Sequence, residues 1–261
     1  PLARVVAQYK DKLPVPFKRY QIQPVWRGEN PQSGRYREFL QCDADIVNSA
    51  SPLSDVEILS LIYNIYRSLG IDVVIKIDDR SLLKEISIKA LAVLDKLNKI
   101  GETGVINELQ TKGFSYKEAT GYLNQAKAFK ASAYILSLMD MYEQTGCPID
   151  SLKFEGTLVR GLDYYTGLIF EVVLKSEPES QSLCGGGRYD NLIGLFANKS
   201  IPAVGFAIGF DRTYEAMEDL NLFSRDLNTT KVLITIFSPD LKNNSIILSA
   251  HLRNKGINTE L

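Results

Sequence analysis

The sequence predicts an α+β protein in which a mostly strand-containing chain is interrupted by a helical segment. Two neighbouring runs, residues 18–28 and 38–47, alternate in polarity as the strands of a hairpin do. Residues 88–146 have a helical pattern almost throughout, and a strand-like run resumes at residues 168–174. We therefore expect one domain built around a sheet, with the helical segment inserted into it. A β-α-β pattern over residues 231–261 predicts the beginning of a second, α/β unit.

The composition narrows the class of protein. The 261 residues include 45% hydrophobic and 23% charged side chains and carry a net charge of −1, which is ordinary for a globular protein. The sequence has no apolar run long enough for a membrane span and no signal-peptide pattern at its start. Its three cysteines are far apart and form no CxxC pair, so we expect reduced thiols, a cytoplasmic protein and no zinc site. With a single histidine, His251, a Ser-His or Cys-His catalytic system is not expected.

The predicted hairpin has one apolar and one polar face. Alternation places Leu40 and Ile46 on the apolar face of the second strand, and Gln41 and Asp45 on its polar face. A helix is expected to pack on the apolar face and a ligand to lie on the polar one. A solvated sheet face is the alternative that these residues leave open.

Arginines surround the connection between the two strands. Arg27 ends the first strand, and Arg35 lies in the polar loop of residues 29–37. Guanidinium groups are planar and permanently charged, so they suit phosphate oxygens, and Phe39 is placed to stack on a purine base. A solvated loop with surface arginines is the alternative interpretation.

Three later segments join glycine to charged or aromatic residues. Residues 159–167, VRGLDYYTG, place two tyrosines at adjacent strand positions, which point to opposite faces. Residues 184–187, Cys-Gly-Gly-Gly, predict a turn, and the absence of a following Gly-Lys-Ser/Thr excludes a P-loop. Residues 205–212 place Arg212 in the first turn of a helix. Each segment alone also fits a structural role, and it is their combination that predicts a site.

Two Ser-x-x-Glu patterns predict where helices begin. Ser54 and Glu57 predict a capping box at the start of a helix that ends at Gly70. Ser115 and Glu118 predict a second capping box within the helical segment.

The order and combination of these segments resemble the histidyl-tRNA synthetase family of class II aminoacyl-tRNA synthetases. Residues 25–46, VWRGENPQSGRYREFLQCDADI, resemble class II motif 2, and residues 202–212, PAVGFAIGFDR, resemble motif 3. Residues 158–172, LVRGLDYYTGLIFEV, resemble the first histidine-specific motif of the family, and residues 183–192, LCGGGRYDNL, resemble the second. The likeness extends over nearly the whole chain, and LVRGLDYYTG is highly specific to the family.

The resemblance implies an antiparallel sheet with flanking helices, a helical insertion and an α/β anticodon-binding domain. It assigns residues 1–86 and 151–223 to a catalytic domain, residues 87–150 to the insertion and residues 230–261 to a partial anticodon-binding domain. Relative to the family, the chain is expected to lack motif 1 at its start and part of the anticodon-binding domain at its end. The stretch near residues 86–87 is also shorter than usual. The implied assembly is a cytoplasmic homodimer without a membrane segment.

The resemblance also implies residue roles, carried over by position in the motifs. Arg27 and Arg160 are implied as the catalytic cations beside the α-phosphate. The implied ATP-binding residues are Arg27, Glu29, Arg35, Phe39, which would stack on adenine, and Arg212, which would bind the γ-phosphate. The implied histidine-binding residues are Gln41, Asp45, Arg160, Tyr164, Tyr165, Gly186 and Tyr189. Among these, Gln41 would bind the α-amino group, and Asp45, where many relatives have glutamate, would bind the imidazole with Tyr165.

The implied activity is that of a histidine–tRNA ligase. Such an enzyme uses ATP and Mg²⁺ to convert L-histidine to histidyl-adenylate and then transfers the histidyl group to tRNA(His). Arginines would offset the repulsion between the attacking carboxylate and the phosphate. A carboxylate and a tyrosine hydroxyl would select imidazole, because an amino acid without ring nitrogens would leave both unpaired. Two alternatives stay open: a catalytically inactive synthetase-like regulatory subunit of histidine biosynthesis, and a pseudo-synthetase module in a larger sensor protein.

Overall fold

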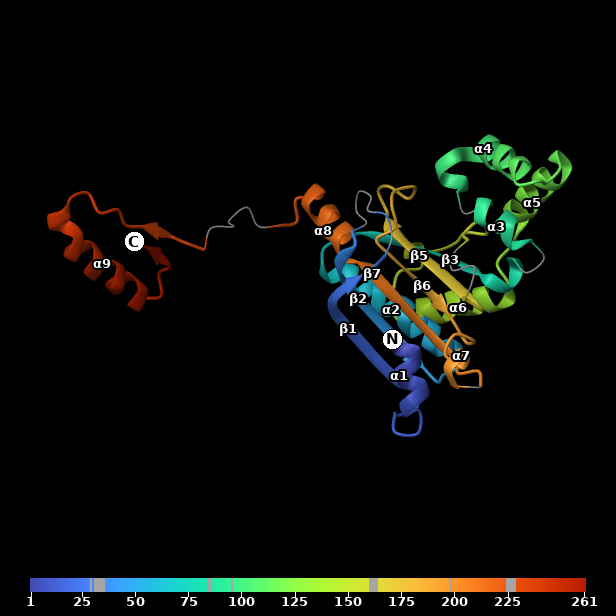
Figure 1. Cartoon of the computed structure of the whole chain (residues 1–261), viewed down its shortest axis with the longest axis horizontal. Coiled ribbons are helices and arrows are strands. Elements are labelled where there is room, and N and C mark those ends of the chain that lie inside the picture. The colour runs from blue at the N-terminus through green and yellow to red at the C-terminus, as the bar shows by residue number, and fades with distance from the viewer. Residues whose placement is uncertain are drawn as a thin grey trace. The chain divides into compact units, whose positions relative to one another are not determined.

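The computed structural model describes most of the chain (Figure 1). The described residues are 1–28, 30, 36–83, 86–94, 96–159, 164–197, 199–223 and 229–261. They divide into two compact units, Pro1–Ala216 and Met217–Leu261. No helix within these ranges is both long enough and apolar enough to span a membrane.

The first unit is built on a sheet that has seven strands in the described part of the chain. Their order is β1-β2-β7-β6-β5-β3-β4. The strands are β1 (Phe17–Trp26), β2 (Glu38–Val47), β3 (Val73–Asp79), β4 (Leu152–Phe154), β5 (Leu168–Leu174), β6 (Cys184–Arg188) and β7 (Ala203–Gly209). Neighbouring strands pair antiparallel except β3 and β4, which are parallel. The predicted hairpin and the α+β fold with an antiparallel sheet are therefore confirmed.

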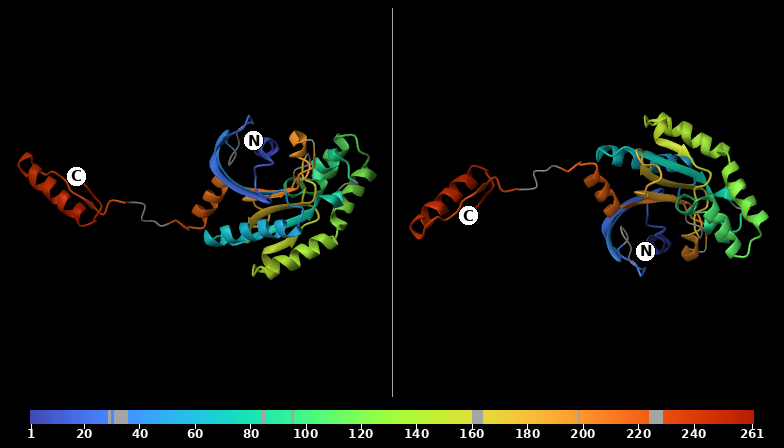
Figure 2. Two further views of the ribbon diagram at one scale, coloured as in Figure 1. Left: turned by 90° about the horizontal axis from the view of Figure 1, so that it is seen from below. Right: turned by 90° about the horizontal axis from the view of Figure 1, so that it is seen from above.

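Helices flank this sheet. They are α1 (Leu2–Tyr9), α2 (Pro52–Ser68), α3 (Ile88–Leu94), α4 (Leu97–Thr111), α5 (Tyr116–Ala128), α6 (Ala133–Gln144), α7 (Gly194–Ala197) and α8 (Phe210–Asp219). Helices α2 and α6 pack against one face of the sheet, which we call the helix face (Figure 2). Leu59 and Ile62 of α2 and Ile75 and Ile77 of β3 are fully buried, and α2 contacts β3. The opposite face, which we call the cavity face, carries Gln41 and Asp45 as well as the buried apolar residues Val47 and Ala203.

The start of α2 differs from the predicted capping box at Ser54 and Glu57. The N-cap is Ser51, whose side chain accepts a hydrogen bond from a backbone amide, and Pro52 follows it in the first turn. Proline suits this place because its fixed φ matches the helix and it has no N–H to leave unpaired. Ser54 consequently lies one turn inside the helix, so the predicted capping box is wrong.

Residues 184–187 form strand β6 and not the predicted turn. This strand lies between β5 and β7 in the middle of the sheet. A Cβ atom on Gly186 would come within 2.1 Å of the Gly205 carbonyl oxygen and 2.6 Å of the Phe170 ring. Glycine is therefore required here by close packing against a neighbouring strand and a ring, and not by a change of chain direction.

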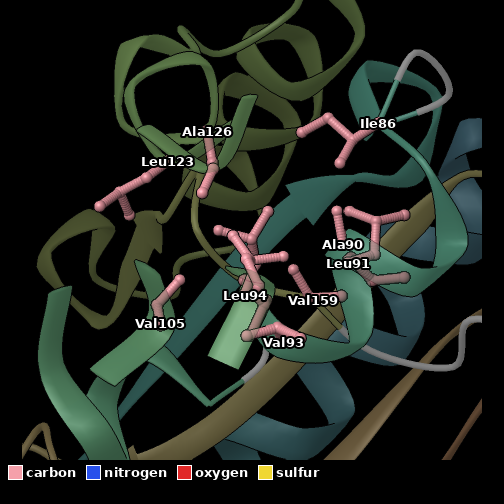
Figure 3. Packing of buried hydrophobic residues seen from close by; sticks show 13 residues of the cluster. Ile86, Ala90, Leu91, Val93, Leu94, Val105, Leu123, Ala126 and Val159 are labelled. Atoms are coloured by element: carbon pink, nitrogen blue, oxygen red, sulfur yellow. The ribbon is translucent and has the colours of Figure 1, made fainter. Parts of the chain in front are cut away.

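The predicted helical segment is confirmed, including the capping box at Ser115 and Glu118. Helices α3, α4 and α5 surround one buried apolar cluster, which includes Leu94, Val105, Leu123 and Val159 (Figure 3). Ile169 of β5 belongs to the same cluster. The segment thus shares its core with the sheet and lies in the same compact unit.

The second unit, Met217–Leu261, contains β8 (Val232–Leu233), α9 (Lys242–Asn254) and β9 (Thr259–Glu260). The two strands pair in parallel across the helix connection, which is the predicted β-α-β pattern. The first strand is shorter than the predicted residues 231–237. His251 lies in α9, exposed to solvent.

Candidate active site

A cavity of about 990 Å³ opens on the cavity face of the sheet in the first unit. Its lining includes residues of β1, β2, β6 and β7, the segment Tyr164–Tyr165 before β5, and the first residues of α1 and α8. This volume is at the upper end for small-molecule sites, so it can hold a ligand much larger than one amino acid.

The register of the strands brings polar side chains and glycines together across the cavity floor. Asp45 of β2 lies opposite Arg19 of β1 on one side and Gly205 of β7 on the other. A Cβ atom on Gly205 would be 2.0 Å from Asp45 Oδ1, so only glycine leaves the carboxylate its position. Gln41 lies opposite Gly209 and lines the same cavity. The predicted placement of Gln41 and Asp45 on one polar face is therefore confirmed.

Asp45 is the buried centre of a charged group of residues, the Asp45 cluster, which consists of buried Asp45 and Tyr189 and half-buried Arg19 and Asp43. The Tyr189 hydroxyl donates a hydrogen bond to Asp45 Oδ1. Arg19 Nη2 lies 2.5 Å from Asp45 Oδ2 and donates a hydrogen bond of 2.6 Å to Asp43 Oδ2. Asp45 is only 8% exposed and Tyr189 only 7%, so these charges interact with little screening by water.

The protonation of this cluster follows from burial and from neighbouring charges. Burial raises the pKa of the Asp45 carboxyl above its ordinary value, and the Arg19 charge and the Tyr189 hydrogen bond oppose that shift. Burial and the adjacent Asp45 carboxylate raise the pKa of Tyr189, which keeps its hydroxyl protonated as a donor. The carboxylate thus depends on Arg19 and Tyr189 for its charge.

The other end of the cavity carries a cation and an aromatic ring. The Arg27 guanidinium lies 4.2 Å from the centroid of the Phe39 ring, which is a cation–π contact. The backbone amide of Arg27 donates to the Arg37 carbonyl at 2.8 Å and so extends the hairpin ladder by one bond. Arg27 is exposed and Phe39 half-buried, so this end is open to solvent.

Arg212 lies in the first turn of α8, as predicted, and lines the same cavity. Its Nη1 donates a hydrogen bond of 3.1 Å to the Ser182 carbonyl oxygen. The helix start and this backbone acceptor together fix the position of a second cation in the cavity.

Tyr164 and Tyr165 both line the cavity, but they are not adjacent strand residues as predicted. They lie in the connection before β5, and their rings contact each other with centroids 4.3 Å apart. A Cβ atom on Gly187 would be 3.0 Å from the Tyr165 ring, so glycine lets that ring approach the sheet closely. The prediction that the two rings point to opposite faces is wrong, because the chain is not extended here.

Several predicted site residues are not tested by this geometry. Glu29, Arg35 and Arg160 lie outside the described residues, as do residues 161–163. Gly186 is described, but the space beside its Cα is occupied by Phe170 on the helix face, whereas its neighbour Gly185 lines the cavity.

Arg19 and Asp43 are members of the cavity lining that the sequence reasoning did not select as site residues. The alternation of β1 does place Arg19 on the same face as Arg27, and the hairpin register puts it opposite Asp45. The length of the hairpin loop, used to set the register of the two strands, would have placed Arg19 next to Asp45.

A second group of residues, the Asp55 cluster, lies on the helix face and consists of buried Asp55 and Arg188 and half-buried Tyr134. Arg188 Nε donates to Asp55 Oδ1 at 3.0 Å, and the Tyr134 hydroxyl donates to Asp55 Oδ2 at 2.6 Å. The Arg188 carbonyl oxygen accepts a hydrogen bond of 2.8 Å from the amide of Thr166. Arg188 therefore anchors the end of β6, and with it the segment that follows Tyr165.

The chemistry of the cavity is that of a two-part site. An aromatic ring and two guanidinium groups suit a base and phosphates, while a buried carboxylate suits a ligand with N–H donors. Among the described residues, no group of three or more His, Cys, Asp or Glu side chains gathers as a metal site.

Comparisons with known proteins agree on one family. A family model described as histidyl-tRNA synthetase matches residues 80–213. The histidine–tRNA ligases of Cytophaga hutchinsonii and Rhodopirellula baltica are 41% and 37% identical to this chain over all of it, and the matches cover 64% and 66% of those proteins. The chain thus spans a little under two thirds of the length of these curated relatives.

Solved structures share the fold. The crystal structure of histidyl-tRNA synthetase from Nostoc sp. PCC 7120 matches 99% of this chain and 68% of its own length, with a TM-score of 0.76 at 26% identity. An ATP phosphoribosyltransferase regulatory subunit/histidyl-tRNA synthetase from Bacillus halodurans matches with a TM-score of 0.72 at 21% identity, covering 100% of this chain and 72% of its own. Because its identity is only 21%, the second match supports a shared fold and nothing more.

Proposed function

The chain belongs to the histidyl-tRNA synthetase family, and on this premise we propose that the protein that carries it is a histidine–tRNA ligase. The proposed reaction joins L-histidine to ATP to give histidyl-adenylate and then transfers the histidyl group to tRNA(His). The observation that carries the proposal is that segments far apart in sequence meet in one cavity. It is lined by Arg27 and Asp45 from the hairpin, Tyr164 and Tyr165, and Arg212.

The open end of the cavity is the proposed ATP site. Phe39 would stack on adenine, and Arg27 and Arg212 would bind phosphate oxygens. When the histidine carboxylate attacks the α-phosphate, two anions approach each other, and guanidinium groups offset that repulsion and stabilise the charge of the transition state. Arg27 and Arg160 are the proposed catalytic cations, and Glu29 and Arg35 are proposed to bind ATP on its adenine side and at its outer phosphates. Glu29, Arg35 and Arg160 lie outside the described residues.

Mg²⁺ would add positive charge at the departing pyrophosphate. The described residues form no metal-binding cluster by themselves. Mg²⁺ in nucleotide sites is usually bound by one or two carboxylates together with substrate phosphates and water. We assign no step to the ion.

The closed end of the cavity is the proposed histidine site. Gln41 would bind the α-amino group, and the Asp45 carboxylate would accept an N–H of the imidazole with Tyr165 beside it. Tyr189 would hold the Asp45 carboxylate in place, since its hydroxyl donates a hydrogen bond to Asp45 Oδ1. An amino acid without ring N–H groups would leave the buried carboxylate unpaired, which is the proposed basis of selectivity.

The remaining expectations from the family stay predictions. They are the homodimer, the cytoplasmic location, and the division into residues 1–86 and 151–223, 87–150 and 230–261.

Exchange of pyrophosphate into ATP, measured with the full-length protein that carries this chain, tests the proposal. The expected result is exchange that requires L-histidine and is not supported by other amino acids. Histidine binding without any exchange would contradict the ligase and favour the inactive regulatory subunit.

A further inference from the structure

Arg19 occupies an unusual position between two carboxylates on the cavity floor. Its Nη2 is 2.6 Å from Asp43 Oδ2 and 2.5 Å from Asp45 Oδ2, and its Nη1 donates to Gln21 Oε1 at 3.0 Å. The Arg19 side chain is only 15% exposed, although it lies on β1, which is an edge strand of the sheet in the described part of the chain. A long cationic side chain on an edge strand would ordinarily extend into water, so the two carboxylates hold it in place.

The charges of the Asp45 cluster do not balance. One permanently charged guanidinium faces two carboxylates, so the floor carries a net charge of −1 when both are ionised. Asp45 Oδ2 is buried with Arg19 as its ion-pair partner, and each oxygen of a carboxylate can accept more than one hydrogen bond. The floor therefore retains capacity to accept an N–H donor or a positive charge from a ligand.

We propose that Arg19 is a positioning residue of the histidine site, which keeps the Asp45 carboxylate ionised and turned toward the cavity to receive the imidazole. This inference rests on the proposed function, since it concerns the same ligand. Tyr189 fixes one oxygen of Asp45, and Arg19 fixes the other. Neither Arg19 nor Tyr189 then needs to contact the reacting atoms.

The physical reason is the cost of burying a lone carboxylate. Burial alone would favour the protonated form of Asp45, and a protonated carboxyl loses acceptor capacity toward the imidazole. The titratable and charged groups that face Asp45 are Arg19, Asp43 and Tyr189, with Tyr165 next to Tyr189. Arg19 lowers the pKa of Asp45, whereas Asp43 raises it. Removing Arg19 should therefore raise the pKa of Asp45, and removing Asp43 should lower it.

Arg19→Gln removes the cation. In histidine-dependent exchange with the full-length protein, we expect the KM for histidine to rise by roughly tenfold or more, the size expected when a buried charge loses its partner. The KM for ATP should stay near the wild-type value. The acid limb of the pH profile of kcat/KM for histidine should move to higher pH, because Asp45 becomes protonated more easily. Arg19→Lys should restore part of both effects.

Asp43→Asn supplies the opposing variant. It removes the second carboxylate, so Arg19 pairs with Asp45 alone and the acid limb should move to lower pH. A merely structural role for Arg19 would weaken the fold in both variants without opposite shifts. If Arg19→Gln does not fold, Arg19→Lys and Asp43→Asn still decide the inference.

Arg67→Gln is the matched control, since Arg67 is an exposed arginine of α2. It should leave the KM for histidine and the pH profile unchanged. An unchanged KM for histidine in Arg19→Gln, or acid limbs that move in the same direction in Arg19→Gln and Asp43→Asn, would overturn the inference while the ligase assignment stood. Wild-type protein without histidine-dependent exchange would instead refute the proposed function.

Discussion

The two faces of the sheet each carry an arginine, an aspartate and a tyrosine that are buried or half-buried, but they differ in how completely these groups are paired. In the Asp55 cluster on the helix face, both carboxylate oxygens accept hydrogen bonds, from Arg188 and from Tyr134. In the Asp45 cluster on the cavity face, the single cation Arg19 is shared between two carboxylates, and its Nε is buried without a hydrogen bond. The same chemistry thus serves stability where it is fully paired, and is suited to ligand binding where an acceptor is left over.

Adjacent residues at the end of β6 make this difference testable within one segment. Arg188 extends to the helix face and Tyr189 to the cavity face. Variants of the first should act on the free energy of unfolding, and variants of the second on the KM for histidine.

Arg188→Ala is expected to have the largest effect. It leaves the Asp55 carboxylate, which is 1% exposed, without its cation. Removing one partner of a buried ion pair costs about 3–5 kcal/mol in the free energy of unfolding. Chemical denaturation measures this loss, and Arg67→Ala on the exposed surface of α2 should change the same quantity by less than about 0.5 kcal/mol. A loss equally small in both variants would mean that the Asp55 cluster does not stabilise the fold.

Gly205→Ala should have the next largest effect, a loss of kcat/KM for histidine that arises on the cavity face. The added Cβ would overlap Asp45 Oδ1 and lie 2.7 Å from the Ala44 carbonyl oxygen, so the carboxylate must move. A displacement of about 1 Å in a site can cost on the order of 100-fold in rate. We expect a loss of that size in kcat/KM for histidine in the exchange assay.

Gly121→Ala on the exposed surface of α5 is the control for this variant, because among the described residues a Cβ there meets nothing within 4 Å. It should leave kcat/KM for histidine unchanged. Equal losses in Gly121→Ala and Gly205→Ala would show that the position of Asp45 is not what the glycine protects.

Tyr189→Phe and Tyr134→Phe form a crossed pair with the smallest expected effects. Each removes one hydroxyl that donates to a buried aspartate. Tyr189→Phe should raise the KM for histidine by roughly fivefold to tenfold, whereas Tyr134→Phe should lower the free energy of unfolding by about 1 kcal/mol and leave that KM unchanged. Steady-state exchange and denaturation of both variants check the pair, and a reversed pattern would contradict the division between the two faces.

The sequence predicts the hairpin side of the site well, because strand alternation is a local property. Gln41 and Asp45 are correctly placed on one face by their spacing, and Arg212 by its position in the first turn of a helix. The fold class follows in the same way from periodicity, with the family resemblance supplying the antiparallel sheet.

What the sequence does not predict depends on contacts between distant segments. The glycines of β6 resemble a turn until Phe170 and Gly205 are seen beside Gly186. Tyr164 and Tyr165 resemble strand residues, although Arg188 and Gly187 from a later strand determine where they lie. Arg19 was overlooked because its pairing with Asp45 depends on the register of the hairpin and not on a motif.

A crystal structure of the full-length protein with a non-hydrolysable histidyl-adenylate analogue tests the central claim most directly. The account predicts the imidazole within hydrogen-bonding distance of the Asp45 carboxylate and the adenine ring against Phe39, in the one cavity. An analogue bound with its imidazole away from Asp45, or outside this cavity, would contradict it.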